Sequence, residues 1–194
     1  MNNAFRSAAA LVSVVTVMAA SPARAERVDA STISCQQLSA AYESKSKSDI
    51  SFINGILNWM GGYHATEEQG TVVDWKKLSD AFDKTVAYCA KHPKIGVMSA
   101  SEKFMGEHIA KAGPDASDLA LVTCETALTD SNITDNIGDV LLWLAGYHTS
   151  TNKESTILDL DKFVEETSQI VDFCVANPQT GLFTASEKFM SETD

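Results

Sequence analysis

The sequence predicts an all-α protein that consists of two tandem helical bundles, each with three or four helices and one disulfide. Three observations indicate this fold class. The hexapeptide ASEKFM occurs at 100–105 and again at 185–190, apolar residues recur at steps of three and four before each copy, and strand-like alternation never extends beyond a few residues. A hexapeptide that occurs twice in 194 residues indicates an internal duplication.

The duplication covers most of the chain, because the same landmarks precede both hexapeptides in the same order. The copies are offset by 89 residues at the first cysteine, by 84 at the tryptophan and by 85 from the second cysteine onward. Differences in length therefore fall between the landmarks, where loops accommodate them. The matched pairs are Cys35 and Cys124, Trp59 and Trp143, Tyr63 and Tyr147, His64 and His148, Cys89 and Cys174, and Pro93 and Pro178.

The chain is expected to divide into four segments. Residues 1–25 combine Arg6, an apolar run and a final ARA, which is typical of a secretory signal cleaved after Ala25. The first repeat is expected at 26–105 and the second at 120–194, joined by a polar linker at 106–119. Export indicates a periplasmic protein, or a secreted one if the host has no periplasm.

Each repeat is small enough that a single hydrophobic core is marginal without a covalent staple. Export permits disulfides, and four cysteines allow three pairings. If each repeat folds alone, the pairs are Cys35 with Cys89 and Cys124 with Cys174, and each stabilises its repeat by roughly 4 kcal/mol. A zinc site is the alternative, but these cysteines lack the close spacing that structural zinc requires.

Two helices are predicted in the body of each repeat. The first contains the tryptophan, and the second begins after a candidate N-cap aspartate, Asp74 or Asp159, and ends before Pro93 or Pro178. The apolar positions of the first helix are Phe52, Ile53, Ile56, Leu57 and Met60, matched by Ile133, Ile137, Val140, Leu141 and Leu144. Those of the second are Trp75, Leu78, Phe82, Val86 and Cys89, matched by Leu160, Phe163, Val164, Val171 and Cys174.

The repeated hexapeptide is expected to open a short last helix in each repeat. Ser99 with Glu102, and Thr184 with Glu187, have the spacing of a capping box, in which a hydroxyl and a carboxylate satisfy free backbone amides. The phenylalanine and methionine that follow are expected to pack on the core.

The charge is strongly acidic. The full chain carries −11 at pH 7, and loss of Arg6 and Arg24 with the signal leaves −13, which argues against a nucleic-acid partner. No segment after the signal is long enough to span a membrane. Carboxylates titrate near ~4, so in strong acid the 13 remaining Lys and Arg, the four His and the amino terminus would carry +18.

These features together resemble the HdeA/HdeB family of periplasmic acid-stress chaperones, in a tandem arrangement. The residues that carry the resemblance are Cys35, Trp59, Gly62, Tyr63, Cys89, Pro93 and Ala100, matched by Cys124, Trp143, Gly146, Tyr147, Cys174, Pro178 and Ala185. The resemblance implies a folded, inactive dimer near neutral pH that loosens in acid and holds unfolding or acid-denatured client proteins without ATP. Because this chain carries two units, the dimer-like interface could form between its own repeats, or between two chains.

Two groups of residues are candidates for this function. Protonation of capping carboxylates would weaken the fold in acid, and the candidate pH-linked caps are Asp74, Glu102, Asp159 and Glu187. Apolar helix faces exposed by loosening would bind clients, and the candidates are Trp59, Met60, Tyr63, Trp143, Leu144 and Tyr147. At neutral pH these six side chains are expected to belong to the core.

Other functions have less support in the sequence. His64 and His148 could be pH sensors or metal ligands, but histidine ordinarily titrates near ~6.5, too high to report on strong acid, and neither has a second ligand at helical spacing. No catalytic motif, cofactor motif or metal motif is present, so no enzyme is predicted. The alternative to a chaperone is an exported binding or assembly module that recognises one specific partner at neutral pH.

Overall fold

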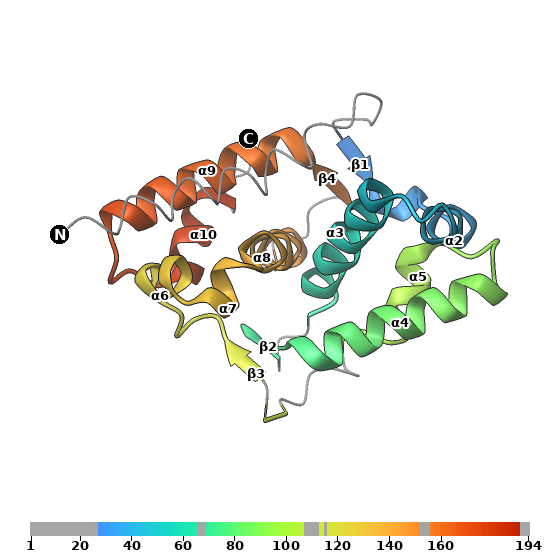
Figure 1. The fold of residues 1–194 in the computed structure, drawn as a ribbon, viewed down its shortest axis with the longest axis horizontal. Helices are drawn as coiled ribbons and strands as arrows, with labels where there is room; N and C mark the ends of the chain where they lie inside the picture. Colours follow the sequence, from blue (N-terminus) through green and yellow to red (C-terminus); the bar gives the residue numbers. More distant parts are fainter. Residues whose placement is uncertain (1–26, 66–68, 107–112, 115, 152–155, 191–194) are drawn as a thin grey trace.

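The structure is a computed structural model that describes residues 27–65, 69–106, 113–114, 116–151 and 156–190. The expected signal at 1–25 and its cleavage site lie outside these residues. Helices dominate the described chain and fall into two tandem sets, so the predicted all-α class with two disulfide-stapled bundles is confirmed (Figure 1).

The first set of helices begins with a 3-10 turn, η2 (Ala30–Thr32), and the second set contains an additional short helix, α7 (Ser131–Thr134). The helix that precedes α7, α6 (Cys124–Thr129), ends before Asp130, whose backbone is extended. The remaining helices of the first set are α2 (Cys35–Glu43), α3 (Lys47–Tyr63), α4 (Trp75–Lys91) and α5 (Val97–Glu102). Those of the second are α6 (Cys124–Thr129), α8 (Ile137–Thr151), α9 (Leu160–Ala176) and α10 (Leu182–Met190).

Helices α3 and α8 lie side by side at the centre of the molecule, with α2, α4 and α5 on one side and α6, α9 and α10 on the other (Figure 1). The sequence predicted an amphipathic helix for each of them. Instead, every residue from Gly55 to Gly62 of α3 and from Val140 to Gly146 of α8 is buried. Each helix is covered on one side by its own repeat and on the other by its counterpart, so it buries its whole circumference.

Four strands of three residues each were not predicted. They are β1 (Arg27–Asp29), β2 (Val72–Asp74), β3 (Ala116–Asp118) and β4 (Ile157–Asp159), and they form two antiparallel pairs, β1 with β4 and β2 with β3 (Figure 1). Three residues are too few to show the alternation by which a strand is recognised in a sequence. Each pair joins the leading strand of one repeat to the strand before the long helix of the other, so the exchange is reciprocal.

The strand β3 lies within 106–119, the stretch that was expected to be only a linker. The offset between the repeats explains the difference, because Asp118 follows Asp29 by the same 89 residues that separate Cys35 from Cys124. In both places the aspartate accepts a hydrogen bond from the amide two residues later, in Ser31 and in Ala120. The structural counterpart of the first repeat's leading strand therefore precedes residue 120.

The last helices begin before the repeated hexapeptide. Helix α5 starts at Val97 and α10 at Leu182, so Ser99 and Thr184 lie within the first turn and do not cap it. The amide of Val97 donates to the carbonyl of Ile33 at 2.8 Å, and that of Leu182 to the carbonyl of Val122 at 2.7 Å. Backbone outside the helix therefore satisfies the amide of the first residue of each last helix.

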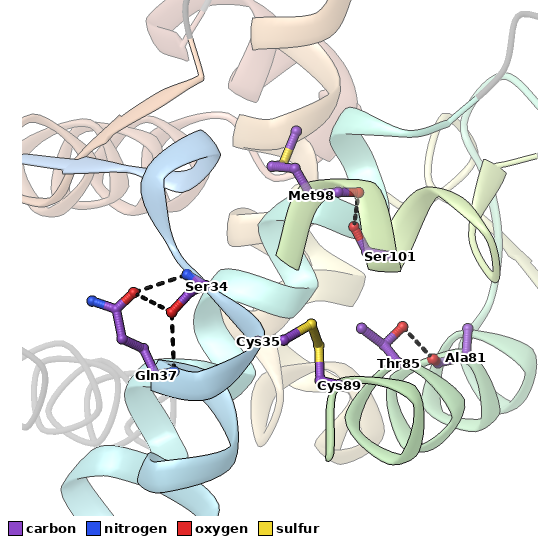
Figure 2. Close-up of a disulfide and its surroundings, with 8 residues drawn as sticks. All are labelled: Ser34, Cys35, Gln37, Ala81, Thr85, Cys89, Met98 and Ser101. Carbon is purple, nitrogen blue, oxygen red and sulfur yellow. Dashed lines mark hydrogen bonds between the residues drawn. A yellow bond between two sulfur atoms is a disulfide. The ribbon is translucent and has the colours of Figure 1, made fainter. Parts of the chain in front are cut away.

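The two disulfides join Cys35 to Cys89 and Cys124 to Cys174, within the repeats. Each ties the first helix of its set to the end of the long helix, and all four cysteines are buried. Figure 2 shows the first bridge, with the capping box of α2 beside it, in which Ser34 and Gln37 satisfy each other's backbone amides. The bridges are the pairs that the duplication indicates.

Candidate functional site: the junction between the two repeats

The two central helices approach at a pair of glycines. A Cβ atom on Gly62 of α3 would overlap the carbonyl oxygen of Trp143 on α8, and one on Gly146 would overlap that of Trp59. The contact is reciprocal, as the matched positions of a duplicated unit require. Glycine permits backbones to approach this closely because it has no side chain, so the junction depends on these two positions.

Replacing Gly62 with alanine is expected to destabilise the protein by about 1–3 kcal/mol, because the methyl group meets a helix backbone that can only move as a whole. This cost outweighs the ~1 kcal/mol that alanine gains over glycine inside a helix. Gly61→Ala is the matched control, since its Cβ would meet a terminal methyl of Leu78 at 2.7 Å, which can rotate away. Denaturant unfolding measures both variants, and equal stabilities would contradict the prediction.

The six candidate client-binding residues lie on α3 and α8 at this junction. Trp59, Met60, Trp143 and Leu144 are at most 1% exposed, whereas Tyr63 and Tyr147 are half-buried. The rings stack in matched pairs: Trp59 and Tyr63 have centroids 5.0 Å apart, and Trp143 and Tyr147 have centroids 5.5 Å apart. In this folded form the two tryptophans, Met60 and Leu144 belong to the buried core, so clients could reach these four only if the repeats separate.

Four aspartates hold the exchanged strands together, and each acts across the boundary between the repeats. Asp29 accepts from the hydroxyl of Thr156 at 2.7 Å, and Asp118 accepts from that of Thr71 at 2.7 Å. Asp159 pairs with Arg27 at 3.3 Å, and Asp74 accepts from the amide of Gly113 at 3.0 Å. Sequence reasoning missed Asp29 and Asp118, although the offset of the first cysteines relates them.

Asp74 and Asp159 also cap the long helices. The carboxylate of Asp74 accepts from the amide of Lys77 at 3.0 Å, and that of Asp159 from the amide of Lys162 at 3.1 Å. The other two candidate caps are wrong in position. Glu102 is the last residue of α5 and Glu187 lies inside α10, because both helices begin before the hexapeptide.

The pKa values of Asp29 and Asp139 are shifted in opposite directions. Hydrogen bonds from the hydroxyls of Ser31 and Thr156 lower the pKa of Asp29, so its stabilisation is present above the unfolded pKa and is lost as pH falls through the folded one. Burial raises the pKa of Asp139 on α8, opposed by a hydrogen bond that Asn58 donates at 2.9 Å. Protonation of Asp139 therefore favours the folded state and opposes acid loosening.

Of the two histidines that follow the tyrosines, His148 is buried and His64 is half-buried. The Nε2 atom of His64 lies 2.9 Å from the hydroxyl of Ser101, and that of His148 lies 3.0 Å from the hydroxyl of Ser186. Both serines belong to the repeated hexapeptide and donate to a carbonyl three residues earlier, that of Met98 or Phe183. The second residue of ASEKFM thus attaches each last helix to the central helix of its repeat. Figure 2 shows the serine of α5.

Burial shifts both histidines toward acid. It lowers the pKa of His148, which is 3% exposed, from 6.5 to about 4. It also lowers the pKa of His64, opposed by the charge of Glu102 and by a hydrogen bond to the backbone of Met98. For His148 the expectation of a titration too high to report on acid is therefore wrong, because it used the value of a solvated side chain.

The described residues contain no group of three or more His, Cys, Asp or Glu side chains that could hold a metal ion. Within the same residues, no helix combines the length and the apolar character needed to cross a membrane.

A sequence profile of the HdeA/HdeB family matches the chain twice, over residues 4–99 and over residues 97–184. Neither a search of curated proteins nor a search of solved structures found a match.

Proposed function

Because the chain belongs to the HdeA/HdeB family, whose members are periplasmic acid-stress chaperones rather than enzymes, we propose that it is an ATP-independent holdase whose two repeats separate in acid. The observation that carries this proposal is the burial of Trp59, Met60, Trp143 and Leu144 between repeats that are joined by aspartates. The apolar surface and the groups that titrate in acid occupy the same junction.

Acid acts on the junction in three ways. It protonates the aspartates that join the exchanged strands, it charges the histidines that attach the last helices, and it converts a net negative charge into a large positive one. The first two remove contacts, and the third makes the repeats repel. The apolar faces of α3 and α8 then become accessible to clients that acid has unfolded.

The disulfides limit the extent of this loosening. Disulfide bonds do not titrate in acid. Each bridge closes a loop within one repeat, with sequence separations of 54 and 50 residues. The repeats are parts of one chain and so remain tethered, and β3, which leads into the second repeat, pairs with β2 of the first (Figure 1). Separation on a tether, with each repeat still cross-linked, would permit return to the folded form at neutral pH.

Export completes the proposal. The segment 1–25 would direct the chain to the periplasm and be removed after Ala25, which leaves the acidic mature protein in the compartment that external acid reaches first.

A disulfide across the other strand pair tests the separation. Val28 and Leu158 face each other in the β1–β4 pair, so Val28→Cys with Leu158→Cys would staple the end of the junction opposite the natural tether. The locked protein is expected to lose most of its ability to suppress client aggregation at a pH of about 2 to 3, whereas the wild type retains it. Light scattering of two unrelated clients measures the activity.

The matched control carries Val28→Ala and Leu158→Ala, which removes the same side chains without the bridge and is expected to remain active. A locked protein as active as this control would exclude separation of the repeats as the activating step. A wild type that leaves clients to aggregate in acid would exclude the holdase itself, and binding of one partner at neutral pH would then favour an assembly module.

A further inference from the structure

A cavity of about 700 Å³ opens on one side of the central helix pair. Its walls come from both repeats: α2, α3 and α4 contribute from the first, and α7 and α8 from the second. It is therefore complete only when the repeats are joined. The proposed holdase activity leaves it unused, because the client-binding candidates lie elsewhere on the same helices.

The lining of this cavity is aromatic and acidic. Three rings, those of Tyr42, Trp75 and Phe82, share it with the carboxylates of Asp83 and Asp139, and no described residue that lines it is basic. The charge of Asp83 acts on the Tyr42 side chain: burial first, and then this charge, raises the pKa of Tyr42. Aromatic faces attract cations through their quadrupole, and carboxylates attract them through charge.

Polar side chains at the back of the cavity are fixed by hydrogen bonds. Asn58 is 6% exposed and donates to Asp139 at 2.9 Å, and the hydroxyl of Tyr42 donates to Asn54 at 2.7 Å. The first bond crosses from α3 to α8. Convergent polar groups that hydrogen bonds hold in place beside aromatic side chains are typical of a small-molecule site.

The other side of the junction lacks this set. At the offsets that relate the repeats, Asn58 corresponds to Leu142, Trp75 to Leu160 and Phe82 to Thr167. By the same offsets Asp83 corresponds to Ser168 and Asp139 to Gly55. The duplicated fold therefore packs with a buried leucine, Leu142, where the cavity has the buried Asn58. Since burying a polar group costs stability, Asn58 is not explained by the packing of the duplicated fold.

We propose that this cavity binds a small organic cation, an ammonium group on an aromatic or aliphatic body. The ammonium would lie between Asp139 and Asp83, and the body would lie against Trp75 and Phe82. Because the site spans both repeats, the bound cation would stabilise the joined form by mass action and delay its separation in acid. Protonation of Asp139 would release the cation, so protons would compete with the ligand for this site.

A matched pair of probes tests the charge requirement. Calorimetric titration at pH 7 with 2-phenylethylamine is expected to show saturable binding, and 2-phenylethanol, which has the same ring and chain without the charge, is expected to bind at least about tenfold more weakly. Asp139→Asn keeps the shape of the side chain and is expected to weaken the amine about tenfold while leaving the alcohol unchanged. Asp172→Asn, on the exposed surface of α9, controls for net charge.

Phe82→Leu provides a second variant that does not alter the Asn58–Asp139 bond, and it is expected to weaken the amine more than the alcohol. Equal affinities for amine and alcohol, absence of saturable binding of the amine, or equal effects of Asp139→Asn and Asp172→Asn would each overturn the proposal. None of these results would bear on aggregation suppression in acid, so the holdase and the cation site fail separately.

Discussion

Removal of the Cys124–Cys174 disulfide by alanine substitution of both cysteines is expected to lower the free energy of unfolding by about 4 kcal/mol, because the bridge closes a loop of roughly 50 residues. Both sulfurs are buried between α6 and the end of α9, so the smaller side chains also leave a void. Denaturant unfolding at pH 7 measures the loss. A repeat of this size has little stability beyond that amount.

The matched control is Cys35→Ala with Cys89→Ala, which removes the equivalent bridge of the first repeat. The two variants are expected to lose similar free energies, because the loops differ by only four residues. In acid, either variant is expected to expand further and to recover less folded protein on neutralisation than the wild type does. Full recovery of both variants would contradict the view that disulfides keep the loosened state reversible.

Local chemistry made most of the fold predictable from the sequence. Asp74 and Asp159 precede the long helices and cap them, and Pro93 and Pro178 follow their ends. The duplication indicated the cysteine pairs, because only pairing within a repeat leaves the copies equivalent. These inferences each need no more than a few neighbouring residues or one internal comparison.

The parts that escaped prediction depend on contacts between the repeats. A three-residue strand such as β3 has no pattern of its own and exists because β2 lies beside it. The capping boxes at Ser99 and Thr184 matched a local pattern, but the helices begin earlier, at Val97 and Leu182, whose amides donate to the carbonyls of Ile33 and Val122. A sequence pattern shows which groups could form a hydrogen bond, and tertiary structure decides which of them do.

The histidines show the same limit in electrostatics. The sequence placed His64 and His148 at matched positions, but only the structure shows that each lies against a serine of the last helix, His148 buried and His64 half-buried. Desolvation lowers the pKa of both, and brings that of His148 to about 4. The repeated hexapeptide thus has a structural explanation: its serine holds a histidine that acid would charge.

Replacing His148 with glutamine is expected to remove about 3 kcal/mol of the pH dependence of stability. The folded pKa is about 4 and the unfolded one about 6.5, so the unfolded chain binds the proton first. Stability is therefore complete above the unfolded value and falls progressively as pH decreases through the window, reaching its full loss below the folded value. Glutamine can retain the hydrogen bond to Ser186 but does not titrate.

Denaturant unfolding at a series of pH values across this window would measure the effect, with His92→Gln at an exposed site as the control. The wild type and the control are expected to lose stability more steeply than His148→Gln, and the variant's onset of aggregation suppression is expected at lower pH. Parallel stability profiles for all three proteins would show that His148 takes no part in the acid response. Because His148 bonds Ser186 of α10, its protonation would weaken the attachment of α10 to the central helix α8.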